Sequence, residues 1–194
     1  MKKLKLLTAA ILSLIIISKI SLADNVSNKY KTEANHTSVT WTANHFGFSS
    51  VSGKFTDIDG IVIFNEKKPE QSSVEVVIKT NILETGIAKL DTHLKSADFF
   101  NVEKFPTATF ISKKITMVGK DKAKIAGNLT LMGITKPIIL DVVFNKSGIN
   151  PVNQKSSIGF TASASLNRSD FGIKYALPGV ADKIDLLIQL EANQ

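Results

Sequence analysis

The sequence predicts an all-β fold, an antiparallel barrel of about eight strands with one short helical insertion. Apolar and polar residues alternate with period two along most of the chain after residue 28, as strands with one buried face do. Turn signals such as Val118-Gly119-Lys120-Asp121 and Met132-Gly133 separate the alternating segments. Strands of this kind close into a barrel wide enough to hold one ligand.

Nine segments show this alternation, so we expect eight to nine strands. They are 29–34, 39–45, 55–64, 74–79, 107–117, 124–131, 138–144, 158–167 and 184–191. Alternation alone does not say which face is inside, because a membrane barrel is apolar outward. A membrane barrel also needs aromatic girdles, and one Trp and two Tyr are too few. We therefore expect the apolar face to line the interior.

The segment 85–103 breaks the strand rhythm. Ile87, Leu90, Leu94 and Ala97 follow helical spacing, and Pro106 ends the segment before the next strand. A helical insertion between two barrel strands is placed to plug or gate one end of the barrel.

Residues 1–23 read as a cleaved secretory signal peptide. Lys2, Lys3 and Lys5 precede the apolar run 6–17, and small residues follow at 21–23. We expect a single domain over 24–194 that is exported to a bacterial periplasm. Loss of the leader removes four lysines and no acids, which lowers the formal charge from +7 to +3.

Composition excludes several function classes. The chain has no cysteine, so burial rather than disulfides must hold the fold together. Without the leader there is no clustered basic face with aromatic platforms, so we expect no nucleic-acid partner. Three histidines without cysteine make a poor set of ligands, and we expect no metal and no cofactor.

Ordered motifs along the chain resemble a known family. They are the segment 91–106, Gly127-Asn128-Leu129-Thr130, Gly133-Ile134-Thr135-Lys136-Pro137 and Arg168-Ser169-Asp170-Phe171-Gly172-Ile173. Together they look like the signature of the YceI-like family. The resemblance implies a lipocalin-like eight-stranded barrel that holds a long isoprenoid or fatty lipid, and it is compatible with a homodimer. Leu90 and Lys95 stand where the family usually has arginines, so Arg168 is the one family arginine kept.

Arg168 is the only arginine beside 23 lysines, and it continues the inward-facing set of 158–167. A guanidinium grips a carboxylate or phosphate with two parallel bonds, so Arg168 is our first candidate for a ligand head group. The alternative is a structural arginine that pairs with Asp170 or caps carbonyls. His45, Asp170 and His93 are further head-group candidates, with a satisfied structural histidine as the alternative for His45 and His93.

Aromatic side chains are the candidates for the apolar wall or plug, with ordinary core packing as the alternative for each. They are Trp41, Phe46, Phe48, Phe99, Phe100, Phe110, Phe160 and Phe171. No nucleophile motif occurs, so we expect no enzyme, although Asp170 beside His45 or His93 would suit acid–base chemistry on a lipid-like substrate. Two other interpretations remain: a binder of isoprenoid quinone linked to redox or stress response, and an interaction protein with a filled core.

Overall fold

The computed structural model describes residues 27–194. The predicted leader, 1–23, and the domain boundary behind it lie outside the described residues. In the part of the chain that the structure describes, no helix is both long and apolar enough to cross a membrane.

The described residues form eleven strands, one α-helix and two 3-10 helices. Their order is β1 (Asn28–Thr32), β2 (Ser38–His45), β3 (Ser49–Phe55), β4 (Ile58–Phe64), η1 (Pro69–Gln71), β5 (Ser73–Lys79), β6 (Leu83–Glu84), α1 (Ala88–Lys95), β7 (Thr107–Met117), β8 (Lys122–Leu131), β9 (Ile134–Ile149), β10 (Ser156–Asn167), η2 (Arg168–Phe171) and β11 (Val180–Asn193).

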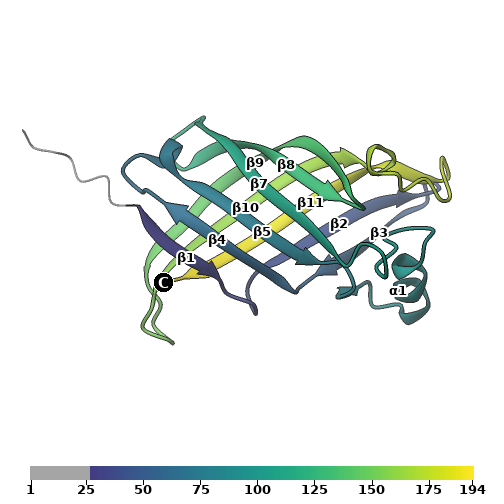
Figure 1. The fold of residues 1–194 in the computed structure, drawn as a ribbon, viewed down its shortest axis with the longest axis horizontal. Helices are drawn as coiled ribbons and strands as arrows, with labels where there is room; N and C mark the ends of the chain where they lie inside the picture. Colours follow the sequence, from purple (N-terminus) through teal and green to yellow (C-terminus); the bar gives the residue numbers. More distant parts are fainter. Residues whose placement is uncertain (1–26) are drawn as a thin grey trace, which may run out of the picture.

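The strands make one closed antiparallel barrel with eight strand positions (Figure 1). Strand β11 pairs with β2 from Val180 to Gln189 and with β1 at its end, so β1 and β2 together fill one bent strand position of the barrel. In the same way β4 pairs with β1 while β3 pairs with β2. Closure leaves the barrel without the long unpaired edge that an open sheet exposes. The all-β barrel predicted from the alternation is confirmed.

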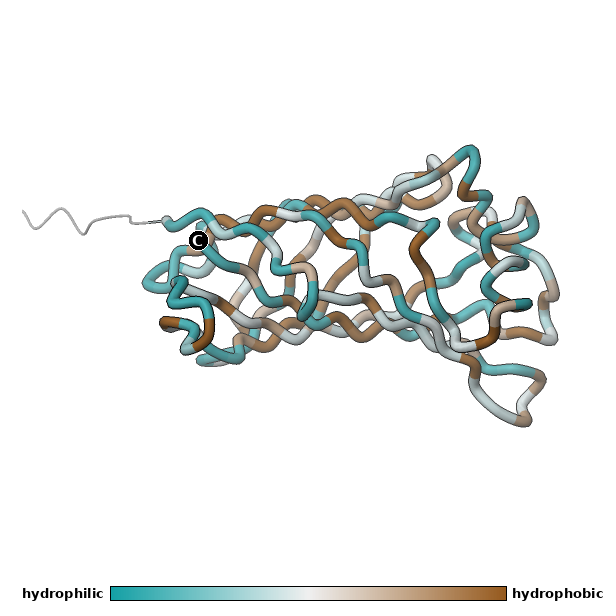
Figure 2. The backbone as a smooth tube through the Cα atoms, turned by 90° about the horizontal axis from the view of Figure 1, so that it is seen from below, coloured by the Kyte–Doolittle hydropathy of each residue, from teal (hydrophilic) through white to brown (hydrophobic). Residues whose placement is uncertain are grey.

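The prediction that the apolar face of each alternating segment points into the barrel is also confirmed. Leu129 and Leu140 are buried inside the barrel, whereas Ile139 and Val143 on the opposite face of β9 are exposed. Hydrophobic and hydrophilic residues are interspersed along the barrel wall in Figure 2. Burial of one face per strand therefore builds a continuous apolar interior.

Strand β3 was not predicted, and the boundary expected at residue 55 is wrong. Phe55 ends β3, and a break at 56–57 separates it from β4. Serines and Gly53 hide β3 in the sequence, because neither has a strand preference. The structure explains Gly53: it pairs with Trp41 across the strands, and a Cβ there would overlap the indole ring.

The helical insertion is shorter than its apolar spacing predicts. Helix α1 begins at Ala88, after the two-residue strand β6, and only Leu94 of the helix is buried. Turns then run through Phe99 and Phe100, which pack against the core. In Figure 1, α1 lies at one end of the barrel and the C-terminus at the other.

Candidate ligand-binding cavity

The barrel encloses a cavity of about 420 Å³. This volume falls within the range of about 300–1,000 Å³ typical of small-molecule sites. The lining is predominantly aliphatic and comes from inward-facing positions of eight strands, for example Val62, Val76, Leu129, Leu140 and Ile188. An elongated apolar molecule is the kind of ligand that such walls accommodate, because they offer few polar partners.

The charged members of the lining all lie at one end. Glu66 belongs to the β4–β5 connection, and Lys120, Asp121 and Lys122 lie at the β7–β8 turn. Figure 1 shows both connections at the end of the barrel away from α1. We call this end the mouth. A ligand's polar group can meet water and charge here without losing contact between its apolar part and the walls.

The α1 end is filled by side chains. Leu94 of α1 and Leu83 of β6 belong to a buried cluster with Phe55 and Trp41. Phe55 and Phe100 meet edge to face, with ring centroids 5.3 Å apart. These packed residues close the barrel beneath α1, so the cavity occupies the half nearer the mouth.

Arg168 lies at the closed end, buried, and does not line the cavity. Its Nε donates to the carbonyl of Ala181 (2.9 Å), Nη1 to that of Ile173 (3.2 Å) and Nη2 to that of Val180 (2.9 Å). Every guanidinium nitrogen therefore has a backbone partner. Burial lowers the pKa of Arg168, and nearby Asp182 opposes this shift. The contacts support the structural alternative, in which the arginine caps carbonyls.

Asp182 completes the Arg168 site. Its carboxylate accepts from the Ser169 hydroxyl (2.7 Å) and the Ser169 amide (2.8 Å). The side-chain hydrogen bond from Ser169, the backbone hydrogen bond and the charge of Arg168 together lower the pKa of Asp182. Asp170, the partner considered from the sequence, is exposed instead. The pairing of β10 with β11 decides which carboxylate lies near the arginine.

His93 ties the helical insertion to the β10–β11 connection. Its Nε2 lies 2.9 Å from Asp98 Oδ2, and its ring contacts Phe99 and Tyr175 with centroids 5.0 Å and 4.9 Å away. This cluster sits on the outside of the closed end. His93 is therefore placed to hold the plug, and its carboxylate partner is Asp98 rather than Asp170.

The remaining candidates divide between core, surface and cavity. Phe110 and Phe160 line the cavity. Trp41, Phe99, Phe100 and Phe171 pack in or against the core clusters. His45, Phe46 and Phe48 lie exposed at the β2–β3 turn, because the inward face of β2 ends at Ala43. The structure thus brings two of the twelve predicted residues to the cavity wall.

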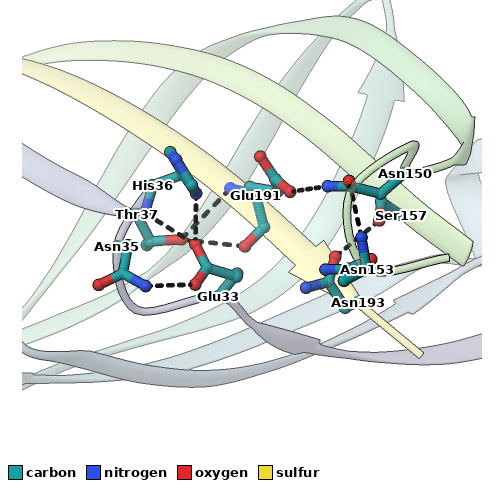
Figure 3. Close-up of polar contacts among 9 residues, drawn as sticks. All are labelled: Glu33, Asn35, His36, Thr37, Asn150, Asn153, Ser157, Glu191 and Asn193. Atoms are coloured by element: carbon teal, nitrogen blue, oxygen red, sulfur yellow. Dashed lines mark hydrogen bonds and ion pairs between the residues drawn. The ribbon is translucent and has the colours of Figure 1, made fainter. Parts of the chain in front are cut away.

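Sequence reasoning missed the mouth residues. The sequence pattern predicts only a turn at Lys120 and Asp121 and predicts no role for Glu66. Thr37 was missed as well, although it is buried, lines the cavity and bonds to Glu191 of β11 (Figure 3). No local pattern marks these residues, because their place depends on which end of the barrel the insertion fills.

Comparisons with known proteins agree on one family. The family model of the YceI-like domain matches residues 30–192. A UPF0312 protein of Enterobacter sp. strain 638 is 40% identical over 194 residues, which cover 100% of this chain and 98% of that protein. Protein YceI of Salmonella arizonae is 39% identical over 171 residues, or 87% of this chain and 88% of its own length.

Solved structures share the fold. The Campylobacter jejuni YceI protein superposes with a TM-score of 0.70 at 32% identity, covering 78% of this chain and 89% of that one. A polyisoprenoid binding domain from Saccharophagus degradans gives a TM-score of 0.65 at 13% identity, covering 84% and 97%. Burkholderia cenocepacia BcnA gives 0.72 at 21% identity, covering 80% and 95%.

Proposed function

Because this chain belongs to the YceI-like family, we propose that it is a binding protein for a long-chain amphiphile of the isoprenoid type. The apolar part of the ligand lies in the barrel and its polar group lies at the mouth. The observation that carries the proposal is the aliphatic cavity whose charged lining residues are confined to one end.

The energetics favour a long apolar tail. Each buried methylene contributes about 0.8 kcal/mol, so a chain of about ten buried carbons supplies roughly 8 kcal/mol before ordering costs. A polar group at the mouth adds only about 0.5–1.5 kcal/mol per neutral hydrogen bond. The tail therefore sets affinity, and the mouth sets orientation. Phe110 and Phe160 contribute to the wall, together with the aliphatic residues around them.

The chemistry of the closed end supports a neutral or mouth-directed head. Arg168 already donates to three carbonyls, and the charged lining residues are all at the mouth. An anionic head buried deep in the barrel would pay a large desolvation cost. Isoprenoid quinone, with its neutral head, is therefore a second candidate ligand.

We propose further that the protein is exported, and that it binds and carries its ligand rather than converting it. A basic, apolar leader at 1–23 supports export to a periplasm. The S. degradans domain is a polyisoprenoid binder with the same fold, which supports the ligand class. Asp98 engages His93 on the outer surface, so this acid–histidine pair does not point to chemistry in the cavity. Light scattering of the purified protein would show whether two barrels pair.

Extraction of bound lipid tests the proposal directly. The protein is purified from its own cell envelope without detergent, and the organic extract is examined by mass spectrometry. We expect a stoichiometric isoprenoid or other long-chain lipid. An empty protein that also fails to take up added isoprenoids would instead favour an interaction protein.

Two alanines of β8 provide a matched pair of variants. Ala123 lines the cavity near the mouth, whereas Ala126 lies outside the lining and pairs with the exposed Ile139. Ala123→Phe should reduce isoprenoid uptake by at least about tenfold, since a ring in the cavity displaces the tail. Ala126→Phe should bind like the original protein. Equal uptake by both variants would contradict binding in this cavity.

A further inference from the structure

We propose that the mouth end of the barrel docks on a membrane surface rich in anionic phospholipid. This inference rests on the proposed function, because a carrier must take its ligand from a membrane or deliver it there. It adds the surface on which exchange takes place. Two features of the mouth carry it: exposed aliphatic side chains at the tips of two turns, and surrounding lysines that form no ion pair with another residue of 27–194.

Three aliphatic side chains project from the connections at the mouth end. Val118 of the β7–β8 turn is 55% exposed, Ile149 at the end of β9 is 62% exposed, and Val152 of the β9–β10 connection is 91% exposed. Figure 1 shows both connections at the end away from α1. Single exposed aliphatics are common on soluble proteins. Val118 lies two residues from Lys120 of the cavity lining, and Ile149 and Val152 lie on a connection at the same end of the barrel, so this end can present all three to the interfacial layer of a bilayer.

Hydrogen bonds hold these tips in place. Asn150 Oδ1 accepts from the amide of Val152 (2.9 Å), and the Asn150 carbonyl accepts from the amide of Gln154 (2.9 Å). Asn150 Nδ2 donates to Glu191 Oε1 of β11 (3.1 Å), which ties the connection to the barrel wall (Figure 3). The turn at Val118 is closed by its amide and the Lys122 carbonyl (2.9 Å). Docking therefore orders little additional chain, and the associated entropy cost stays small.

Lysines surround the mouth. Six of them lie in or beside the β4–β5, β7–β8 and β9–β10 connections, namely Lys67, Lys68, Lys120, Lys122, Lys146 and Lys155. None of the six forms an ion pair with another described residue, whereas four lysines elsewhere on the barrel do. Four described carboxylates share this end: Glu66, Glu70 and Asp121 in the connections and Glu191 beside Asn150. Glu66 accepts from the Ser147 hydroxyl. The excess of cations gives the rim an attraction for anionic head groups.

The closed end also exposes apolar side chains, and it is the competing surface. Phe48 is 92% exposed at the β2–β3 turn. The cavity does not reach this end, since none of its lining residues comes from that turn. A ligand that left the barrel there would have to displace the packed side chains beneath α1. Phe48 is therefore a suitable control position for the test.

Vesicle flotation tests the surface without any cargo. Purified 24–194 is mixed with unlabelled vesicles of phosphatidylcholine alone or with phosphatidylglycerol, and the protein that floats is measured. We expect flotation with phosphatidylglycerol, less without it, and a decrease as salt is raised, because salt screens the lysines.

Val118→Ser with Val152→Ser should weaken vesicle binding by about three- to tenfold. Lys67→Gln with Lys68→Gln should weaken it by about tenfold or more. Phe48→Ser should have no effect.

Each outcome separates docking from ligand binding. The valine and lysine positions named for substitution lie outside the cavity lining, so their variants should take up isoprenoid from solution as the original protein does. Flotation that fails for the original protein, or that is lost with Phe48→Ser and kept with the valine variant, overturns the docking surface. Failure of isoprenoid uptake by the original protein overturns the proposed function and does so independently of flotation.

Discussion

The hydroxyl of Thr37 completes the hydrogen bonding of Glu191 where β11 changes partners. Thr37 Oγ1 donates to the carbonyl of Glu191 (2.9 Å) and accepts from its amide (3.2 Å). Strand β11 pairs with β2 up to Gln189 and with β1 from Ala192. The bend between β1 and β2 would otherwise interrupt the pairing of β11 at this point. Figure 3 shows Thr37 beside Glu191.

Thr37→Val should therefore lower the free energy of unfolding by about 1–3 kcal/mol, because it keeps the shape and removes both hydrogen bonds from a buried site. Thr37→Ser retains the hydroxyl and should lose less. Urea unfolding of the three proteins measures the difference. Equal stability of the valine variant and the original would show that the hydroxyl does not support the bend.

Arg168→Lys should lower the free energy of unfolding by about 2–4 kcal/mol, because an ammonium cannot reach the three carbonyls that the guanidinium fork reaches. Isoprenoid uptake by the folded variant should stay unchanged, since Arg168 lies outside the cavity lining. Denaturant unfolding and ligand titration provide the two readouts. A variant of normal stability that loses its ligand would restore Arg168 as a head-group contact.

Asp182 should make stability depend on pH in the acid range. Its folded pKa lies below the ordinary value of 3.8 because of the Ser169 hydrogen bonds and the Arg168 charge. The stabilisation is thus present above the unfolded pKa and is lost as pH falls through the folded value. Asp182→Asn should lower stability at neutral pH and flatten its decline below about pH 4.

Thermal unfolding between neutral and acid pH tests the role of Asp182. Asp170→Asn, an exposed substitution on the 3-10 helix that carries Arg168 and Ser169, is the control and should follow the original profile. Parallel pH profiles for the original protein and Asp182→Asn would contradict the linkage.

Gly53→Ala should destabilise the protein by about 1–3 kcal/mol, because a Cβ at this position overlaps the indole of Trp41. The same substitution in a Trp41→Leu background should cost less, since the ring is absent. A double-mutant cycle by denaturant unfolding gives the coupling. Trp41 is the only tryptophan, so its fluorescence also reports the displacement. Additive effects would show that the glycine serves another purpose.

Local pattern was enough to identify most of the strands and their faces. Period-two alternation in 138–144 and 184–191 placed Leu140, Val142, Leu186 and Ile188 inside, where the structure has them. Alternation works here because each strand buries one face, and a shift by one residue would expose the whole apolar set. The same reasoning missed β3, because Gly53 is required by the close approach of the Trp41 ring on β2 and has no strand preference of its own.

The candidate site could be predicted only in part. Phe110 and Phe160 were expected on the wall and line the cavity. All four head-group candidates, Arg168, His45, Asp170 and His93, lie away from the lining. Parity correctly predicts a side chain's face, but it does not say at which end of the barrel that face opens. Beyond the last paired residue of a strand the alternation no longer applies, as Arg168 shows, and the last residue of a strand can already be exposed at the barrel end, as His45 shows.

The sequence by itself determined the all-β barrel, its apolar interior and the helical insertion, because these follow from the local period of side-chain polarity. Only the tertiary structure decided which half of the interior stays open, since Leu94, Phe100 and Phe171 fill one end by contacts between distant segments. The tertiary structure also places Arg168 against three backbone carbonyls and Lys120 and Lys122 at the mouth. Packing among residues far apart in the chain has no signature in a local pattern.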